Sequence, residues 1–259
     1  MIVLLHSSKT MRRVPHALPL QQPALIVKTR ELAEYIKTLS APTLADVMKI
    51  SPALANKTHD MFAEWSAEPA KVSAAMDSFV GDIYSGLRAT ELSESDRLYA
   101  QEHLRILSGL YGVLRPLDGI CAYRLEMAYK LPDVPFDNLY TFWDTDVTRQ
   151  LPAKGIILNL ASNEYSKLVL PYVDPARVIA PRFLTTDPKT KEPKFVVVHA
   201  KIARGAFARW VIQNKIEDAK RLLDFAEIGY RYCEELSTPQ EPVFVCQEFG
   251  GKGLSMRLS

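Results

Sequence analysis

Basic side chains gather on one face of a predicted helix at residues 201–215, where they could bind phosphate. At about 100° per residue, Lys201, Arg204 and Lys215 lie on the side opposite the apolar residues. Arg209 lies at the flank of this face, and no acidic residue occurs in the segment. A core helix with a solvated charged face would have the same pattern. The missing acids favour a surface that binds phosphates and loses affinity as salt rises.

A second basic stretch, residues 103–126, combines small residues with arginines. Ser108, Gly109 and Gly112 permit a tight turn whose backbone N–H groups point outward and can bind a phosphate. The arginines that could add charge-assisted hydrogen bonds are Arg105, Arg115 and Arg124. A predicted helix, this turn and the apolar residues after it suggest a helix-hairpin-helix, which grips the duplex backbone without reading bases. A glycine that ends a core helix is the alternative interpretation.

Acidic and phenolic side chains outside these basic segments could transfer protons. Lys9 lies in a polar turn after the first predicted strand, whereas Tyr84, Glu126 and Glu164 lie in other polar segments. Carboxylates repel phosphate, so such acids indicate either a structural network or chemistry. If Lys9 and Arg204 hold an anion, Glu126 or Glu164 could move a proton.

Motifs for metals, cofactors and covalent catalysis are missing from the sequence. The five histidines show no H-x-x-x-H spacing, and there is no G-x-S-x-G. The three cysteines are far apart and form no C-x-x-C, which argues against a disulfide framework and a structural zinc site. We therefore predict no metal and no cofactor, and a reducing compartment.

The whole chain has the composition of a globular protein. Its 259 residues are 47% hydrophobic and 24% charged. The net charge of +2 is too small to indicate nucleic-acid binding by itself, but residues 1–30 carry only basic charges, which permits a locally positive cleft. No apolar run reaches membrane-spanning length, and the N-terminus does not resemble a signal peptide. The expected location is the cytoplasm, with no membrane partner.

The elements that must position these residues are mostly helical in the first half and strand-like in the second. Helices are predicted at about 29–79, 93–108, 139–151 and 201–215, and strands at 2–6, 155–160, 177–184, 194–199 and 241–248. Thr43, Ser51 and Ser93 are typical helix N-caps, and the polar turn at 186–193 is typical of a hairpin. No linker divides the chain. The sequence therefore predicts one α+β domain over residues 1–259, with a mixed sheet and surrounding helices.

Several segments, in this order and nearly end to end, closely resemble the YaaA peroxide-stress family. They are Ser8–Thr10, Gly81–Leu87, His103–Asp118, Tyr123–Met127, Leu139–Trp143, Asn159–Tyr165 and Ala200–Gly205. Strings that recur together in the same order are far more specific than any one of them.

The resemblance implies a cytosolic protein that helps cells survive hydrogen peroxide by limiting unincorporated iron and damage to DNA. It also implies an α+β fold with a positively charged cleft, and sequence-independent binding of duplex or branched DNA through a helix-hairpin-helix. Carried over to this sequence, that motif falls on Arg105, Ser108, Gly109, Gly112 and Arg115. Lys9, Lys201 and Arg204 would supply the charge of the cleft.

Two hypotheses about function follow, of which the sequence favours the first; an interaction or iron-handling role, for which the sequence offers no ligand set, is a third. The first is a DNA-binding stress protein without turnover, which grips phosphates with Lys9, Arg105, Arg115, Lys201, Arg204 and Arg209. The second is an enzyme acting on a phosphorylated or nucleotide-like small molecule, with Lys9, Tyr84, Glu126 and Glu164 as its catalytic candidates. A small pocket that encloses Lys9, Tyr84 and Glu164 would favour the enzyme.

Overall fold

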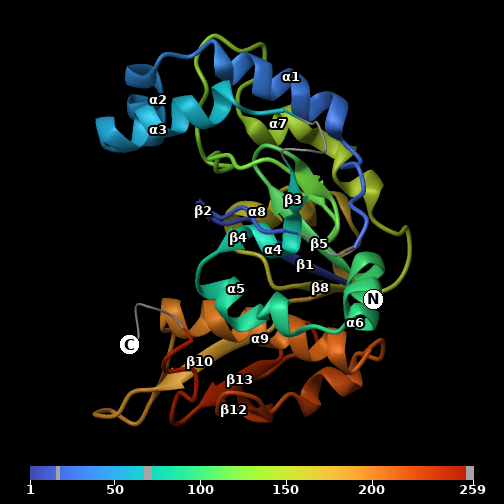
Figure 1. Ribbon diagram of the computed structural model, residues 1–259. Coiled ribbons are helices and arrows are strands. Elements are labelled where there is room, and N and C mark those ends of the chain that lie inside the picture. The colour runs from blue at the N-terminus through green and yellow to red at the C-terminus, as the bar shows by residue number, and fades with distance from the viewer. Residues whose placement is uncertain (16–17, 67–71, 255–259) are drawn as a thin grey trace.

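A five-stranded sheet forms the centre of the molecule (Figure 1). The computed structural model describes residues 1–15, 18–66 and 72–254. The strand order is β6-β5-β1-β8-β9, with bounds Gly112–Leu114, Leu104–Ser108, Ile2–His6, Ile157–Asn159 and Val178–Ile179. Strands β5, β1, β8 and β9 are parallel, and β6 is antiparallel to β5. Every residue of β1 and β5 is buried, as is typical of parallel strands covered on both faces.

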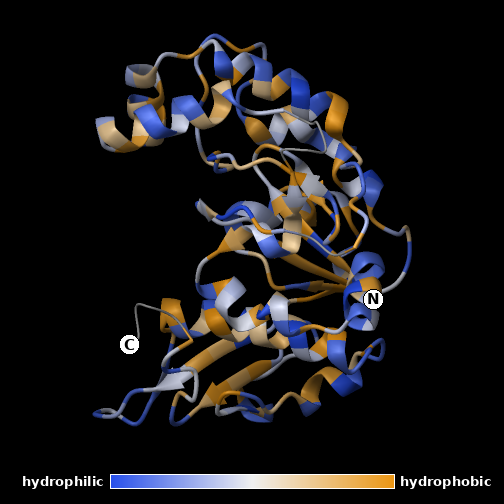
Figure 2. Ribbon diagram, in the orientation of Figure 1, coloured by the Kyte–Doolittle hydropathy of each residue, from blue (hydrophilic) through white to orange (hydrophobic). Residues whose placement is uncertain are grey.

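A second sheet lies on the other side of the longest helix, α9 (Val197–Gln213), as Figure 1 shows. Its order is β11-β10-β13-β12, with bounds Pro193–Lys194, Arg182–Thr186, Val243–Cys246 and Tyr230–Tyr232. Aromatic rings fill the space between helix and sheet: the centroids of Phe207 and Phe225 are 4.7 Å apart, and those of Phe207 and Phe244 are 5.4 Å apart. Figure 2 shows apolar residues along the strands of this sheet.

Helix α9 crosses helix α5 (Asp82–Leu87) with the two backbones in direct contact. A Cβ atom on Gly205 would lie well inside contact distance of the Ile83 carbonyl oxygen. A Cβ atom on Gly86 would meet the Ile202 carbonyl oxygen in the same way. Only glycine permits so close an approach. The crossing therefore fixes the position of α9 relative to the segment that begins at α5.

The other helices and two short ribbons complete the fold. The helices are α1 (Ile26–Lys37), α2 (Ala41–Met48), α3 (Pro52–Ala63), α4 (Ala75–Ser78), α6 (Glu94–His103), α7 (Leu139–Trp143) and α8 (Asn163–Ser166). The ribbons pair β2 (Thr10–Met11) with β4 (Phe79–Val80), and β3 (Ser73–Ala74) with β7 (Gly119–Ile120). None of the helices formed by the described residues has the length and apolar character that a membrane crossing requires.

The α+β class and several local predictions are confirmed. Strand β1 has the predicted bounds, and β10 and β11 form the predicted hairpin. Ser51 caps α3 as expected, and Ser93 forms a capping box with Asp96 at the start of α6. The cap of α2 is Ser40 rather than Thr43, which lies three residues further on. Residues 67–71 of the predicted helical region lie outside the described residues.

The predicted helix-hairpin-helix at residues 103–126 is wrong. Helix α6 ends at His103, and the chain continues directly as β5, which turns back through Gly112 into β6. Gly112 has a φ of 66°, a left-handed conformation that glycine adopts without strain, and it lies in the turn of a β-hairpin. Residues 104–108 form a strand rather than a helix because they pair with β1 and β6 in the interior. No feature of the neighbouring residues in the sequence indicates this pairing. The predicted strand at 194–199 is also wrong from Val197 onward, where α9 begins.

Candidate functional site

A pocket lies at the edge of the five-stranded sheet where the parallel strands β1 and β8 end. Its volume is about 430 Å³, and its wall includes the polar side chains of His6, Ser7, Lys9, Asp82, Tyr84, Glu126, Glu164, Tyr165 and Lys201. Ligands of open parallel sheets bind at this edge, outside the carboxyl ends of the strands. The pocket is therefore the candidate functional site.

Glu126 lies at the centre of the acidic part of the pocket. Its Oε1 accepts a hydrogen bond of 3.1 Å from the Tyr165 hydroxyl, and its Oε2 is 3.6 Å from the Lys9 ammonium. Its side chain is only 13% exposed. Burial raises the pKa of Glu126, and the neighbouring Glu164 carboxylate raises it further, whereas the charge of Lys9 lowers it. A carboxyl group with a raised pKa and a fixed orientation is suited to proton transfer.

Tyr165 is held between Glu126 and the end of β1. The Ser7 hydroxyl donates a hydrogen bond of 3.2 Å to the Tyr165 oxygen. The Tyr165 ring stacks on His6, with the two centroids 4.9 Å apart. Tyr84 fixes the same strand end, because its hydroxyl donates to the His6 carbonyl oxygen over 2.9 Å. These contacts give the acidic part of the pocket a rigid support.

His6 is neutral and has a defined tautomer. Its Nδ1 accepts a hydrogen bond of 3.2 Å from the backbone N–H of Ser162, so the proton of the neutral ring lies on Nε2. Burial lowers the pKa of His6 to about 3, and the charges of Arg204 and Lys201 add to that effect. The ring can donate a hydrogen bond to an anion but carries no charge at neutral pH.

We expect buried His6 to make the protein sensitive to acid. The pKa of His6 is about 3 in the folded protein and about 6.5 in the unfolded chain, so the unfolded chain binds more protons between these values. Stability is therefore lost as pH falls from 6.5 towards 3, by about 1.4 kcal/mol per pH unit at most. Urea unfolding at pH 7 and pH 4.5 should show a smaller pH effect in His6→Gln. An equal effect in both proteins would contradict the neutral histidine.

Helix α9 supplies two cationic side chains at the pocket, Lys201 and Arg204. Lys201 lines the pocket, and Arg204 lies one turn further along, close enough for its charge to act on His6. Among the residues that the structure describes, neither side chain forms a salt bridge or donates a hydrogen bond. Burial lowers the pKa of Arg204, which nevertheless remains charged. Unpaired cations at a pocket are suited to binding an anion.

Glu164 is anchored by backbone contacts. Its Oε1 accepts a hydrogen bond of 3.0 Å from the backbone N–H of Ala128, and its carbonyl oxygen accepts one of 2.8 Å from the Tyr140 hydroxyl.

The catalytic candidates predicted from the sequence, Lys9, Tyr84, Glu126 and Glu164, all lie on the wall of one pocket. The positively charged cleft stays a prediction, because this pocket carries both signs of charge.

The family model described as peroxide stress protein YaaA matches residues 1–236. The chain belongs to this family. A UPF0246 protein of Salinispora tropica is 58% identical over 258 residues, which cover 99% of this chain and 98% of the relative. A UPF0246 protein of Roseobacter denitrificans is 41% identical over 95% of this chain and 98% of its own. A UPF0246 protein of Alteromonas mediterranea is 43% identical over 86% of this chain and 89% of its own length.

Several residues in the YaaA-family segment 103–118 lie in the interior. Arg105 is 5% exposed, and its guanidinium donates to the carbonyl oxygens of Gln101 and Leu104. Ser108 is fully buried and lies 2.6 Å from the Tyr123 hydroxyl. Both side chains therefore serve the core around β5.

The remaining predicted phosphate-binding residues lie away from the pocket wall. A Cβ atom on Gly109 would meet the Leu125 carbonyl oxygen, and one on Gly112 would lie 2.9 Å from Trp143. Arg115 lies 3.8 Å from Glu102, and Arg209 donates to Glu91 over 3.1 Å. Phosphate binding by these residues stays a prediction. Lys9 and Lys201 are the predicted cations that line the pocket, with Arg204 behind them.

The sequence pattern does not single out His6 or Ser7, although both belong to the site. The only signal is their place at the exit of an apolar strand, where sites of open sheets occur. Metal ligands are not grouped: within residues 1–15, 18–66 and 72–254, no three His, Cys, Asp or Glu side chains lie together as a metal site requires.

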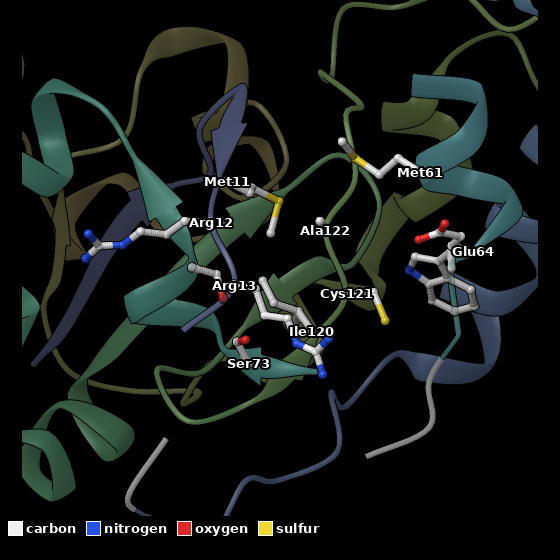
Figure 3. Close-up of a pocket in the computed structure, with 11 residues that line it drawn as sticks. Met11, Arg12, Arg13, Met61, Glu64, Ser73, Ile120, Cys121 and Ala122 are labelled. Atoms are coloured by element: carbon white, nitrogen blue, oxygen red, sulfur yellow. The ribbon is translucent and has the colours of Figure 1, made fainter. Parts of the chain in front are cut away.

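A second, smaller pocket of about 230 Å³ lies beside the first, on the other residue of strand β2 (Figure 3). Thr10 lines the first pocket, whereas Met11 lines the second together with Met61 and Cys121. Figure 3 shows the thioethers of Met11 and Met61 on either side of Ala122. The ribbon of β2 and β4 thus contributes to the walls of both pockets.

Proposed function

We propose that the protein is an enzyme that binds a small phosphorylated or nucleotide-like molecule in the pocket at the end of β1. Lys201 and Arg204 bind the anionic group, and Glu126 transfers a proton. The observation that carries this proposal is that Lys201 and a carboxyl group with a raised pKa line one pocket, with Arg204 close behind, and that neither cation has a salt-bridge or hydrogen-bond partner among the described residues. Such a combination of titratable groups in a concave site is typical of catalysis.

The proposed roles follow from the contacts of each group. A phosphate accepts charge-assisted hydrogen bonds from lysine and arginine. Within the described part of the chain, neither Lys201 nor Arg204 has a partner that it must leave to form them. Glu126 is oriented by Tyr165, and burial raises its pKa above that of an exposed glutamate, so it holds a proton more tightly. A small ligand can align its charges with both parts of the pocket, whereas a continuous polyanion would face the carboxylates as well.

The proposal predicts that Glu126→Gln separates binding from turnover. Nucleoside phosphates and sugar phosphates would be incubated with the protein, and consumption of each would be followed by mass spectrometry. For the compound that is consumed, the variant should lower kcat by about 10²–10⁴, because general acid–base catalysis contributes that much. Its affinity should fall by much less than kcat, since glutamine keeps an acceptor for Tyr165. Equal turnover by the variant would refute the role of Glu126.

DNA binding is the second candidate function that we propose. In this proposal the protein acts in the cytoplasm, binds duplex or branched DNA independently of sequence, and limits iron-dependent oxidative damage. Membership of the peroxide stress family supports it. So does Lys9, whose side chain is 57% exposed at the pocket and whose carbonyl oxygen accepts a hydrogen bond from Arg124. These two cations could contact phosphates outside the pocket.

Salt dependence tests DNA binding. Each phosphate contact contributes about 0.9 to the slope of log affinity against log salt. Lys201→Ala combined with Arg204→Ala should therefore lower the slope by about two if both cations contact the duplex. Lys220→Ala with Arg221→Ala, which removes two exposed cations elsewhere, is the control. A flat salt response of the wild-type protein would exclude DNA as the ligand.

A further inference from the structure

The wall of the pocket is divided into two regions of opposite charge. The cations Lys201 and Arg204 act on His6, at the end of β1. The Glu164 carboxylate acts on Glu126, and both carboxylates act on Tyr165. Lys201 on the wall and Arg204 behind it, which have no salt-bridge or hydrogen-bond partner among the described residues, thus mark one region. Two carboxylates mark the other.

The contacts of the described residues keep these two regions apart. The charged groups that shift the pKa of Glu126 are Glu164, Lys9 and Arg124, and neither cation of α9 is among them. His6, on which the cations of α9 act, stacks on Tyr165 with the ring centroids 4.9 Å apart, and Tyr165 in turn donates a hydrogen bond to Glu126. A ligand that fills the pocket therefore meets cations at one end and carboxylates at the other.

The carboxylate region has free capacity to accept hydrogen bonds. One oxygen of Glu164 accepts from the backbone N–H of Ala128. Among the described residues, its other oxygen has no partner. The Oε2 atom of Glu126 faces Lys9 at 3.6 Å, a long separation for a pair whose lysine is mostly exposed. An ammonium group of a ligand could replace Lys9 there, because exposed ion pairs are weak.

We propose that the ligand of this pocket is an amino phosphate, in which the phosphate lies against Lys201 and Arg204 and an ammonium group lies between Glu126 and Glu164. This inference rests on the proposed function and specifies its substrate class. The ammonium compensates the two adjacent carboxylates, and the phosphate compensates the two cations. Each end therefore gains charge-assisted hydrogen bonds from groups that lack full partners among the described residues.

Two probes of similar size test the proposal: ethyl phosphate and 2-aminoethyl phosphate. Isothermal titration calorimetry on the full chain should show that the amino compound binds about 10- to 100-fold more tightly, because a hydrogen bond between charged groups contributes that much. Glu164→Gln should reduce this preference to about threefold or less, since it removes the charge but keeps an acceptor for Ala128. Glu235→Gln, at an exposed acid outside the pocket, should retain the full preference.

The outcomes separate the inference from the proposed function. Equal affinity for both probes in the wild-type protein would overturn the ammonium subsite but leave phosphate binding intact. A preference that persists in Glu164→Gln would overturn the assignment of the ammonium to the carboxylates. Binding of neither probe would overturn both the subsite and the proposed phosphate site. Thermal unfolding of each variant identifies any loss that is due to misfolding.

Discussion

Replacing Gly205 by alanine should destabilise the protein by about 3 kcal/mol or more, as expected for overpacking at a site that cannot relax. Alanine favours a helix over glycine by about 1 kcal/mol, so an exposed helical position would respond with the opposite sign. At Gly205 the new methyl group meets the carbonyl oxygen of Ile83, which belongs to the backbone of α5 and cannot rotate away. The measurement is the free energy of unfolding in urea.

The same substitution at Gly155 is the control for this prediction. No atom lies within 4 Å of a Cβ placed there, although its φ of 91° adds backbone strain. We expect Gly155→Ala to cost about 1–2 kcal/mol. If Gly205→Ala were no more destabilising than Gly155→Ala, the contact between α5 and α9 would not be as close as described. Gly86→Ala, on the opposing helix, should reproduce the larger loss.

Removing both cations of α9 should abolish binding of phosphorylated ligands. A hydrogen bond to a charged group contributes about 1.5–3 kcal/mol, so Lys201→Met combined with Arg204→Met should weaken binding by about 10²–10⁴. Methionine keeps much of the aliphatic length of both side chains and limits the loss of packing. Calorimetry with the phosphorylated compound that the wild-type protein consumes provides the measurement. Affinity within a few-fold of the wild type would contradict the site.

The same double variant has a readout that needs no ligand. Lys201 and Arg204 lower the pKa of His6, in addition to the larger effect of burial. Their removal should therefore raise the pKa of His6, while burial keeps it below the ordinary value. Titration of the histidine ring signals by NMR measures this shift. A control with Lys220→Met and Arg221→Met should leave His6 unchanged.

Local features of the fold could be predicted from the sequence because neighbouring residues determine them. The apolar run Ile2–Leu5 predicts a buried strand, and Ser51 followed by Pro52 predicts a helix start. The stretch around Gly109 and Gly112 shows the limit. A glycine turn after a helix has the same local signs whether a second helix or a strand follows, and the pairing of β5 with β1 decided the outcome.

The site could be predicted only in part, for a similar reason. Lys9, Glu126 and Glu164 are chemically conspicuous, and the sequence proposes them as candidates, yet nothing in the chain shows that they share a pocket. For an arginine, the sequence can suggest a ligand-binding role that the fold does not support. Arg105 has the chemistry of a phosphate ligand, but it lies on a central strand, is buried, and donates from Nη1 to two backbone carbonyl oxygens. Charge can be read from the sequence, whereas burial requires the fold.

The direct backbone contact of α5 and α9 has a consequence for how the pocket selects among ligands. Helices that touch at Gly86 and Gly205 cannot slide past each other without a steric clash, so the cations of α9 keep a constant distance from Tyr84. The Tyr84 hydroxyl binds the His6 carbonyl oxygen, and His6 stacks on Tyr165, which holds Glu126 at the other charged end. The distance between the two charged regions of the pocket is therefore fixed. Homologous ligands that differ by single methylene groups between their two charged ends should show a sharp optimum of length, rather than a gradual gain with size.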